Sequence, residues 1–405
     1  MKISAKAFMW AAFCLLAFAG SANAQEDDSK WKVGGWLTQS FTWNPSTPAN
    51  RFNGPVTFTD RANEYQLNQA YTYIEGTTDT GGSGIDLGGR VDFLYGTDYR
   101  FTTQTGLEQN SDGTNNWNGE NHRFYGLAMP QFYAEVAIND LKTKIGHFYS
   151  PVGFFVVPAT GNFFNTMPYT FQYGEPFTHT GFLSTYTITD DLTLGGGLIK
   201  GWDNFDNSFN PHVGFIDTQT WQINETSSLA LVHTNSQEAS ASPTAGGFSY
   251  RFLQTLVYSN QLTENLQYVL HSDYGHQENA TAAGRSAAWY GANQYLFYKV
   301  NDKLSLGFNF EWFRDLDGFR VANLTAPLAN GSTRSAPLAG GWTGNFFQIT
   351  TGPKIQLTDN IMIRPNARWD WYSGPRSIND GVSLPYDDGN KGTQFIFGTD
   401  VTVSF

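Results

Sequence analysis

The sequence has a single cysteine, few basic residues and, after its first 25 residues, no long apolar run. Cys14 lies in an N-terminal segment expected to be removed, so the mature chain has no thiol for a disulfide, a cysteine zinc site or a cysteine nucleophile. With Lys+Arg 24 against Asp+Glu 36, the net charge of −12 disfavours wrapping nucleic acid. No run after the first segment approaches the ~20 apolar residues of a membrane-spanning helix. If the protein crosses a bilayer, it must do so with strands.

The first segment has the order of a secretory signal. Two lysines precede an apolar run from Ala7 to Ala19, and Ala22-Asn23-Ala24 provides a cleavage site. The mature chain is therefore expected to begin at Gln25, and an uncleaved anchor helix is the less favoured alternative. The predicted organisation is a signal peptide at 1–24, a short disordered lead-in at 25–30 and one transmembrane β-barrel at 31–405.

Aromatic residues make up 16% of the chain and charged residues only 15%, which disfavours a disordered or coiled-coil protein. The aromatics recur in segments of alternating character. Between residues 303 and 313, Leu and aromatic side chains occupy one face, while Lys303, Ser305, Asn309 and Glu311 occupy the other. The same alternation recurs at 85–95 and 361–371. Strands with lipid-facing aromatics on one side and charges on the other are typical of a transmembrane barrel.

Short polar turns separate pairs of these strands, because Asx and Ser/Thr side chains satisfy turn backbone groups locally. The expected turns are Gly81–Gly84, Asn139-Asp140, Thr189–Asp191, Asn224–Thr226, Thr263–Asn265, Asn301–Lys303 and Thr358–Asn360. Longer connections rich in Gly, Asn, Pro and Ser alternate with them. Adding first and last strands at Trp31–Trp43 and Thr393–Phe405 predicts an all-β, antiparallel, up-and-down barrel of about 16 strands, with 14 to 18 allowed. Short turns would face the periplasm and long loops the outside.

The C-terminal strand ends on an aromatic residue. A stripe of period two is formed by Phe395, Phe397, Thr399, Val401, Val403 and Phe405, with polar or small residues between them. A terminal Phe on such a stripe resembles the signal that outer-membrane barrels present to their assembly machinery. The expected partners are therefore outer-membrane lipid and, through Phe405, that machinery.

Two sequences flanking an aromatic loop carry a family resemblance. They read KIGHFYSPVG at 144–153 and PFTHTG at 176–181. Together with the barrel pattern, they resemble the OmpL-like putative β-barrel porin family of Gram-negative outer membranes. The resemblance implies a diffusion channel without naming a substrate.

A barrel of this width leaves an aqueous lumen, so the predicted function is a porin for passive diffusion of small hydrophilic solutes or ions. Strand parity places cations and acids on the inner wall in nearly equal number, which predicts weak ion selectivity. The side chains predicted to line the pore are Lys32, Arg90, Asp92, Glu135, Lys142, Lys144, Lys303, Glu311, Arg364, Arg368 and Asp370. Homotrimers are an expectation by analogy with other barrels of this size.

The third long loop, from Tyr149 to Thr178, is expected either to fold into the barrel and narrow the pore or to cover its outer mouth. It is rich in Pro and aromatics, and Glu175 is its one charged residue. The residues predicted to form the constriction are Phe155, Phe163, Phe164, Tyr169 and Glu175.

Two other functions compete with the porin. A structural or adhesive barrel would bind an extracellular partner through its loops. A barrel lipid hydrolase would need a serine beside a histidine, but the neighbours His271 and Ser272 must face opposite sides of a strand. The His 7 of the chain have no metal-ligand spacing. An enzyme, a cofactor and a metal site are therefore not expected.

Overall fold

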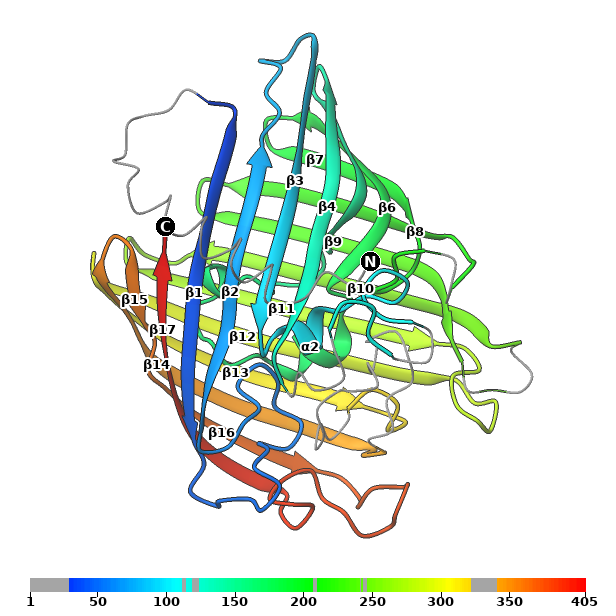
Figure 1. The fold of residues 1–405 in the computed structure, drawn as a ribbon, viewed down its shortest axis with the longest axis vertical. Coiled ribbons are helices and arrows are strands. Elements are labelled where there is room, and N and C mark those ends of the chain that lie inside the picture. The colour runs from blue at the N-terminus through cyan, green and yellow to red at the C-terminus, as the bar shows by residue number, and fades with distance from the viewer. Residues whose placement is uncertain are drawn as a thin grey trace.

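The computed structural model describes residues 29–110, 114–118, 124–206, 210–240, 242, 246–321 and 341–405. The predicted signal peptide at 1–24 and residues 25–28 of the lead-in lie outside the described residues. In the described part the chain forms a single closed antiparallel sheet (Figure 1).

Consecutive strands pair with each other except β15 and β16, which both pair with β14 and β17, and β1 pairs with β17 to close the ring. The strands are β1 (Trp31–Trp43), β2 (Glu64–Gly76), β3 (Ile85–Gly96), β4 (Gly126–Ile138), β5 (Leu141–Tyr149), β6 (Thr178–Thr189), β7 (Leu192–Ile199), β8 (Gly214–Asn224), β9 (Ser227–Ala239), β10 (Phe248–Gln261), β11 (Leu266–Gln277), β12 (Ala287–Asn301), β13 (Leu304–Asp315), β14 (Gly344–Thr358), β15 (Ile361–Ile363), β16 (Asn366–Ser373) and β17 (Thr393–Ser404). Three short helical segments lie in the connections: α2 (Tyr99–Thr102), η1 (Ala159–Gly161) and η2 (Thr170–Gly174). No helix among the described residues is long and apolar enough to cross a membrane.

The segments β15 and β16 are two parts of one wall strand. Both pair with β14 and with β17, and the register is the same on either side of the break: Ile355 faces Ile363, and Thr351 faces Ala367. The break falls at Pro365, which has no N–H to donate to a ladder. The 17-stranded sheet therefore contains sixteen wall strands, and the predicted number is confirmed.

The short turns form at the predicted positions, and polar side chains in these turns stabilise them by accepting backbone hydrogen bonds. Asn301 Oδ1 accepts the backbone N–H of Lys303 at 2.9 Å and of Leu304 at 3.0 Å. Asn224 Oδ1 accepts the N–H of Thr226 at 3.0 Å in the same way. All seven short connections join consecutive strands, so they share one rim and the long loops share the other. The first and last strands close the ring, and at the short-turn rim Gly35 N donates to Phe405 O at 3.1 Å.

The two faces of the wall differ as their alternation predicts. On β13, Leu306 and Phe308 are exposed, whereas Asn309 and Glu311 are buried. The exposed set includes many Trp, Tyr, Phe, Leu and Ile side chains from all around the ring. A band of outward apolar and aromatic side chains is the surface that a bilayer requires. The buried side chains lie inside the ring, where loops cover them.

Candidate functional site

The connection between β5 and β6, residues 150–177, runs into the ring and reaches the opposite wall. We call it the inner loop. Its backbone is held by Glu311 on β13, which lies eight strands from β5 in a sixteen-strand ring. It also contacts β2, β12, β16 and Arg364, which lies between β15 and β16. The inner loop therefore spans the lumen and does not cover the outer mouth alone.

The base of the inner loop is closed by the two sequences that carry the family resemblance. Ser150 N donates to Phe177 O at 2.8 Å, and Ser150 Oγ lies 3.0 Å from His179 Nε2. His179 Nδ1 is in turn 2.9 Å from the carbonyl oxygen of Gly201. The two motifs are separated in sequence by the inner loop, and their residues meet at its base.

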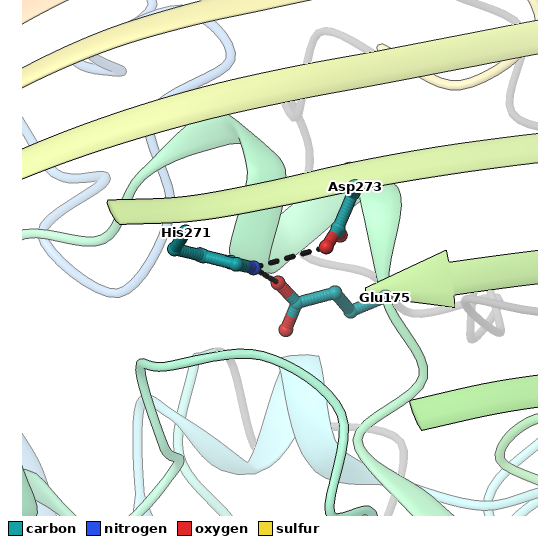
Figure 2. Close-up of side chains that lie close together, drawn as sticks. All are labelled: Glu175, His271 and Asp273. Carbon is teal, nitrogen blue, oxygen red and sulfur yellow. Dashed lines mark hydrogen bonds and ion pairs between the residues drawn. The ribbon is translucent and has the colours of Figure 1, made fainter. Parts of the chain in front are cut away.

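Glu175 points away from that base toward β11. Its carboxylate lies against Gly153, where φ is +83° and an added Cβ would come within 2.2 Å of Glu175 Oε2. Only glycine fits that position, because it needs both the positive φ and the empty space. Glu175 then meets His271 and Asp273 of β11, and all three side chains are buried (Figure 2).

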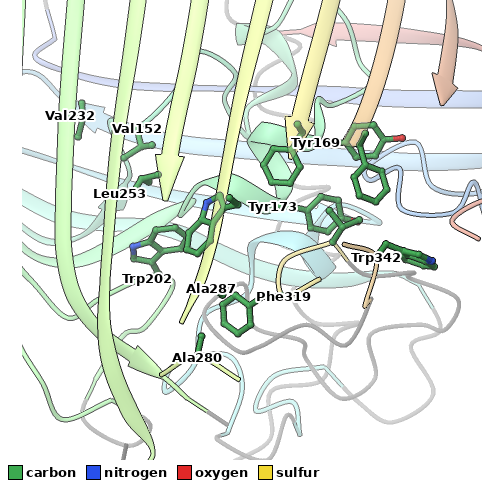
Figure 3. Packing of buried hydrophobic residues seen from close by; sticks show 14 of the residues in the cluster. Val152, Tyr169, Tyr173, Trp202, Val232, Leu253, Ala280, Ala287, Phe319 and Trp342 are labelled. Carbon is green, nitrogen blue, oxygen red and sulfur yellow. The ribbon is translucent and has the colours of Figure 1, made fainter. Parts of the chain in front are cut away.

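Aromatic side chains of the inner loop pack against side chains of the inner wall (Figure 3). Tyr169 and Tyr173 of the inner loop belong to a cluster of buried apolar residues that also includes Trp202 and Trp289. In a second cluster Phe155 and Phe164 are buried, and Phe163 stacks on Phe297 of β12 with ring centroids 4.7 Å apart. All five residues predicted for the constriction thus lie in contact with the barrel interior.

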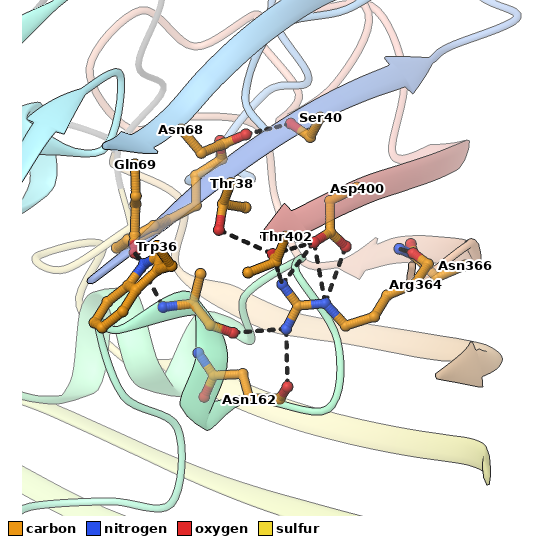
Figure 4. Close-up of polar contacts among 12 residues, drawn as sticks. Trp36, Thr38, Ser40, Asn68, Gln69, Asn162, Arg364, Asn366, Asp400 and Thr402 are labelled. Atoms are coloured by element: carbon orange, nitrogen blue, oxygen red, sulfur yellow. Dashed lines mark hydrogen bonds and ion pairs between the residues drawn. The ribbon is translucent and has the colours of Figure 1, made fainter. Parts of the chain in front are cut away.

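Arg364 fastens one stretch of the inner loop to the wall (Figure 4). Its guanidinium donates to the carbonyl oxygens of Ala159 at 2.6 Å and Asn162 at 2.9 Å, and it pairs with Asp400 at 2.7 Å. On the neighbouring wall, Gln69 Nε2 donates to Val157 O at 2.7 Å. The loop backbone is buried here, and side chains of the wall satisfy its polar groups.

A second group of charges holds the start of η2. Glu311 accepts the backbone N–H of Tyr169 at 2.8 Å and of Thr170 at 2.6 Å. Arg368 donates to Met167 O at 2.6 Å and pairs with Asp370 at 2.8 Å. Charge-assisted hydrogen bonds of this kind are about twice as strong as neutral ones.

The lumen on the short-turn side of the inner loop is hollow. A cavity of about 480 Å³ lies there. Threonines dominate its lining, together with Glu75, Glu135, Lys142 and Lys144, and Pro151 of the inner loop lies on its margin. Lys142 Nζ donates to Thr78 O at 3.0 Å, and Lys144 Nζ lies 4.9 Å from the ring centre of Tyr133.

The residues predicted to line the pore thus fall into three groups. Arg364, Arg368, Asp370 and Glu311 are buried and hold the inner loop. Glu135, Lys142 and Lys144 line the cavity, and Arg90 beside it pairs with Asp92 at 2.7 Å. Lys32 and Lys303 are exposed at the short-turn rim.

Sequence reasoning missed Glu75 and Asp400 as functional charges. Glu75 faces Arg90 directly across β2 and β3 and pairs with it at 3.1 Å, and Asp400 pairs with Arg364. Strand parity could have found both residues, because Asp400 alternates with the outward stripe of the last strand and Glu75 alternates with Ile74.

Burial raises the pKa of two carboxyl groups in the connection between β3 and β4. It raises the pKa of Asp98 to about 7, although Asn68 and Gln69 donate to that carboxyl at 3.1 and 2.9 Å. It raises the pKa of Glu108 to about 8, although the N–H of Gln104 donates to it at 2.8 Å. Removal from water disfavours the charged form more than these bonds favour it.

The family described as putative beta-barrel porin-2, OmpL-like, matches residues 30–405. Solved outer-membrane channels share the fold. The channel DcaP of Acinetobacter baumannii has 11% identity and a TM-score of 0.56, covering 93% of this chain and 97% of that chain. An anion-selective porin from Comamonas acidovorans has 11% identity and a TM-score of 0.57, covering 93% and 99%. OprB of Pseudomonas putida has 12% identity and a TM-score of 0.57, covering 93% and 94%. No curated protein sequence matches the chain.

Proposed function

The chain belongs to the family of OmpL-like, putative beta-barrel porin-2 proteins, and we propose that it lets small hydrophilic solutes or ions diffuse passively across the outer membrane. The observation that carries this proposal is the closed ring of sixteen wall strands with polar and charged side chains on its inner face. A ring of that size is wider than its own wall side chains can fill. The rate of diffusion would then depend on the part of the lumen that the inner loop does not occupy.

The cavity on the short-turn side supports a path for hydrated solutes. Its lining includes the hydroxyl groups of several threonines, two carboxylates and two ammonium groups, so a solute that enters exchanges water for other hydrogen-bonding partners. Glu75 and Glu135 balance Lys142 and Lys144 in charge. The path is therefore proposed to discriminate weakly between anions and cations.

The inner loop is proposed to be the constriction of this path. The hydrogen bonds that Arg364 and Arg368 donate to the loop and that Glu311 accepts from it support the proposal, since they tie residues 159–170 to the wall opposite the loop base. A segment held at both sides of a ring reduces its free cross-section. Phe163 and Phe164, between these hydrogen bonds, and Phe155, before them, are proposed to make this part of the path apolar.

The decisive experiment measures single-channel conductance in planar lipid. Deleting residues 161–173 should increase the conductance several-fold relative to the wild-type barrel, because the deleted part contacts the opposite wall. A matched control deletes residues 281–284, at the tip of the connection between β11 and β12, and should leave the conductance unchanged. Equal conductance in the wild type and the inner-loop deletion would contradict the constriction.

The same recordings test the competing function. An absence of stepwise conductance in both the wild type and the inner-loop deletion would favour a structural or adhesive barrel. Assembly is proposed to be a homotrimer, since one structure with this fold is described as a trimer form of an outer membrane protein of Vibrio cholerae. Light scattering of the purified barrel in detergent checks the number of chains.

A further inference from the structure

The end of the inner loop and the wall strand β11 bring three potential metal ligands together. His271 and Asp273 are two residues apart, so both point into the lumen, and Glu175 approaches them from the inner loop (Figure 2). His271 Nε2 lies 3.1 Å from Glu175 Oε1 and 3.0 Å from Asp273 Oδ1. One ligand atom from each residue lies within 4.8 Å of the others.

We propose that Glu175, His271 and Asp273 bind a divalent transition-metal ion, best suited to Zn²⁺, that fastens the inner loop to β11. The proposal concerns binding to these side chains, and it does not depend on whether the barrel conducts. It departs from the expectation drawn from sequence, in which the histidines had no ligand spacing.

The distances between the three groups fit a shared ion. With Zn–N and Zn–O bonds of about 2.0–2.2 Å, neighbouring ligand atoms around one tetrahedral ion lie roughly 3.4 Å apart. The separations of 3.0 and 3.1 Å are a little shorter than this. A small outward shift of the carboxylates therefore makes room for an ion in place of the two contacts to His271 Nε2.

Buried polar atoms without a hydrogen-bond partner point to the same conclusion. The side chains of His271 and Asp273 are 1% and 0% exposed. Among the described residues, Asp273 Oδ2 and His271 Nδ1 have no hydrogen-bond partner. An unsatisfied buried oxygen is costly, and a second bond to the metal or to a metal-bound water removes that cost.

Charge and ligand type select the ion. A protonated imidazole supplies one positive charge to two carboxylates, whereas a dication supplies two and leaves the imidazole neutral. Nitrogen ligation disfavours Ca²⁺ and Mg²⁺, which take oxygen ligands. Imidazole with carboxylates suits Zn²⁺, with three protein ligands and a water completing four-coordination.

The test uses the full mature barrel, purified in detergent without a polyhistidine tag and stripped of metal with a chelator. After addition of Zn²⁺ and desalting, metal analysis should find about one equivalent per chain. His271→Gln and Asp273→Asn should each lower the retained zinc at least tenfold. His233→Gln is the matched control, because His233 pairs with one carboxylate, Asp217 at 2.9 Å, and with no second one in the part of the chain that the structure describes. It should retain the full equivalent.

A second measurement does not require the variants to fold. Thermal unfolding of the wild-type barrel should shift upward by several degrees with Zn²⁺ and should not respond to equal Mg²⁺. Co²⁺ added in place of Zn²⁺ should give visible absorption bands of a four-coordinate site. Wild-type protein that retains no zinc and shows no thermal shift overturns the proposal, as does equal retention by folded His271→Gln and Asp273→Asn.

Discussion

At the scale of single residues, the charges on the inner wall mainly hold the inner loop in place. Arg364 is fully buried and divides its donors between Asp400 and two loop carbonyls. Arg368 and Glu311 act in the same way on the stretch before η2. Of the charges predicted to line the pore, those beside the cavity and the exposed Lys32 and Lys303 at the short-turn rim do not hold the inner loop.

Replacing Arg364 by Met should destabilise the barrel by about 3–5 kcal/mol, because Asp400 then stays buried without its counter-ion. The double variant with Asp400→Leu should recover part of that loss, since it removes the unpaired charge. Urea unfolding in detergent measures both free energies. Lys303→Met, at an exposed rim position, serves as the control and should change stability by less than about 0.5 kcal/mol. A single variant as stable as the double variant would contradict the role given to the ion pair.

The raised pKa of Glu108 predicts that the stability of the barrel depends on pH. Its pKa rises from an ordinary value near 4.3 to about 8 in the folded protein, so the folded state binds the proton more tightly. The stability this provides is complete below about pH 4 and declines by roughly 1.4 kcal/mol per pH unit until about pH 8. Glu108→Gln should remove this decline, so the variant gains on the wild type between pH 5 and pH 9 in urea unfolding. Glu264→Gln, on a short turn, should follow the wild type at both pH values.

At the scale of elements, the last strand, β17, and the residue that follows it both contact β1. It closes the ring by pairing with β1 from Trp36 to Trp43, and the residue after it, Phe405, exchanges backbone hydrogen bonds with Gly35. An added Cβ at Gly35 would come within 2.6 Å of the Phe405 ring. The exposed ring of Phe405 continues the outward stripe of β17.

Removing Phe405 should therefore affect assembly in the cell more than folding in vitro. Loss of one exposed ring and two backbone hydrogen bonds should lower stability by only about 1–3 kcal/mol. The amount of barrel in the outer membrane should fall several-fold, because the proposed signal to the assembly machinery is missing. Heat-modifiable migration of membrane fractions and of protein refolded in detergent measures the two effects. Phe395→Ala, an equally exposed position at the far end of the strand, is the control.

At the scale of the whole molecule, the excess of acidic residues does not lie at the cavity. The chain carries −12 overall, yet the cavity lining has two glutamates and two lysines. The paired charges Arg364–Asp400 and Arg368–Asp370 also cancel. The proposed weak selectivity of the path follows from this local balance, whereas the net charge acts at a distance and is screened by salt.

Changing Lys142 and Lys144 together to Glu should make the barrel cation-selective. The lining would then carry four carboxylates and no ammonium group, so cations would be concentrated in the path. The reversal potential in a salt gradient should move clearly toward the cation side, while the wild type stays near zero. Lys299→Glu, a residue outside the cavity lining, should give the wild-type value. A reversal potential unchanged by the double variant would place the solute path elsewhere.

The amino-acid sequence by itself predicts the export signal, and its local patterns determine the strands and turns of the barrel wall. Alternation of period two decides which face meets lipid, and Asx turns such as Asn301 and Asn224 decide where strands reverse; both effects act within a few residues. The tertiary structure alone decided the interior. Glu311 meets Tyr169, Arg364 meets Asn162, and Glu175 meets His271 only because the closed ring brings opposite walls to the inner loop. No local pattern encodes such contacts, since the partners lie 96 to 202 residues apart and their distance depends on the diameter of the ring.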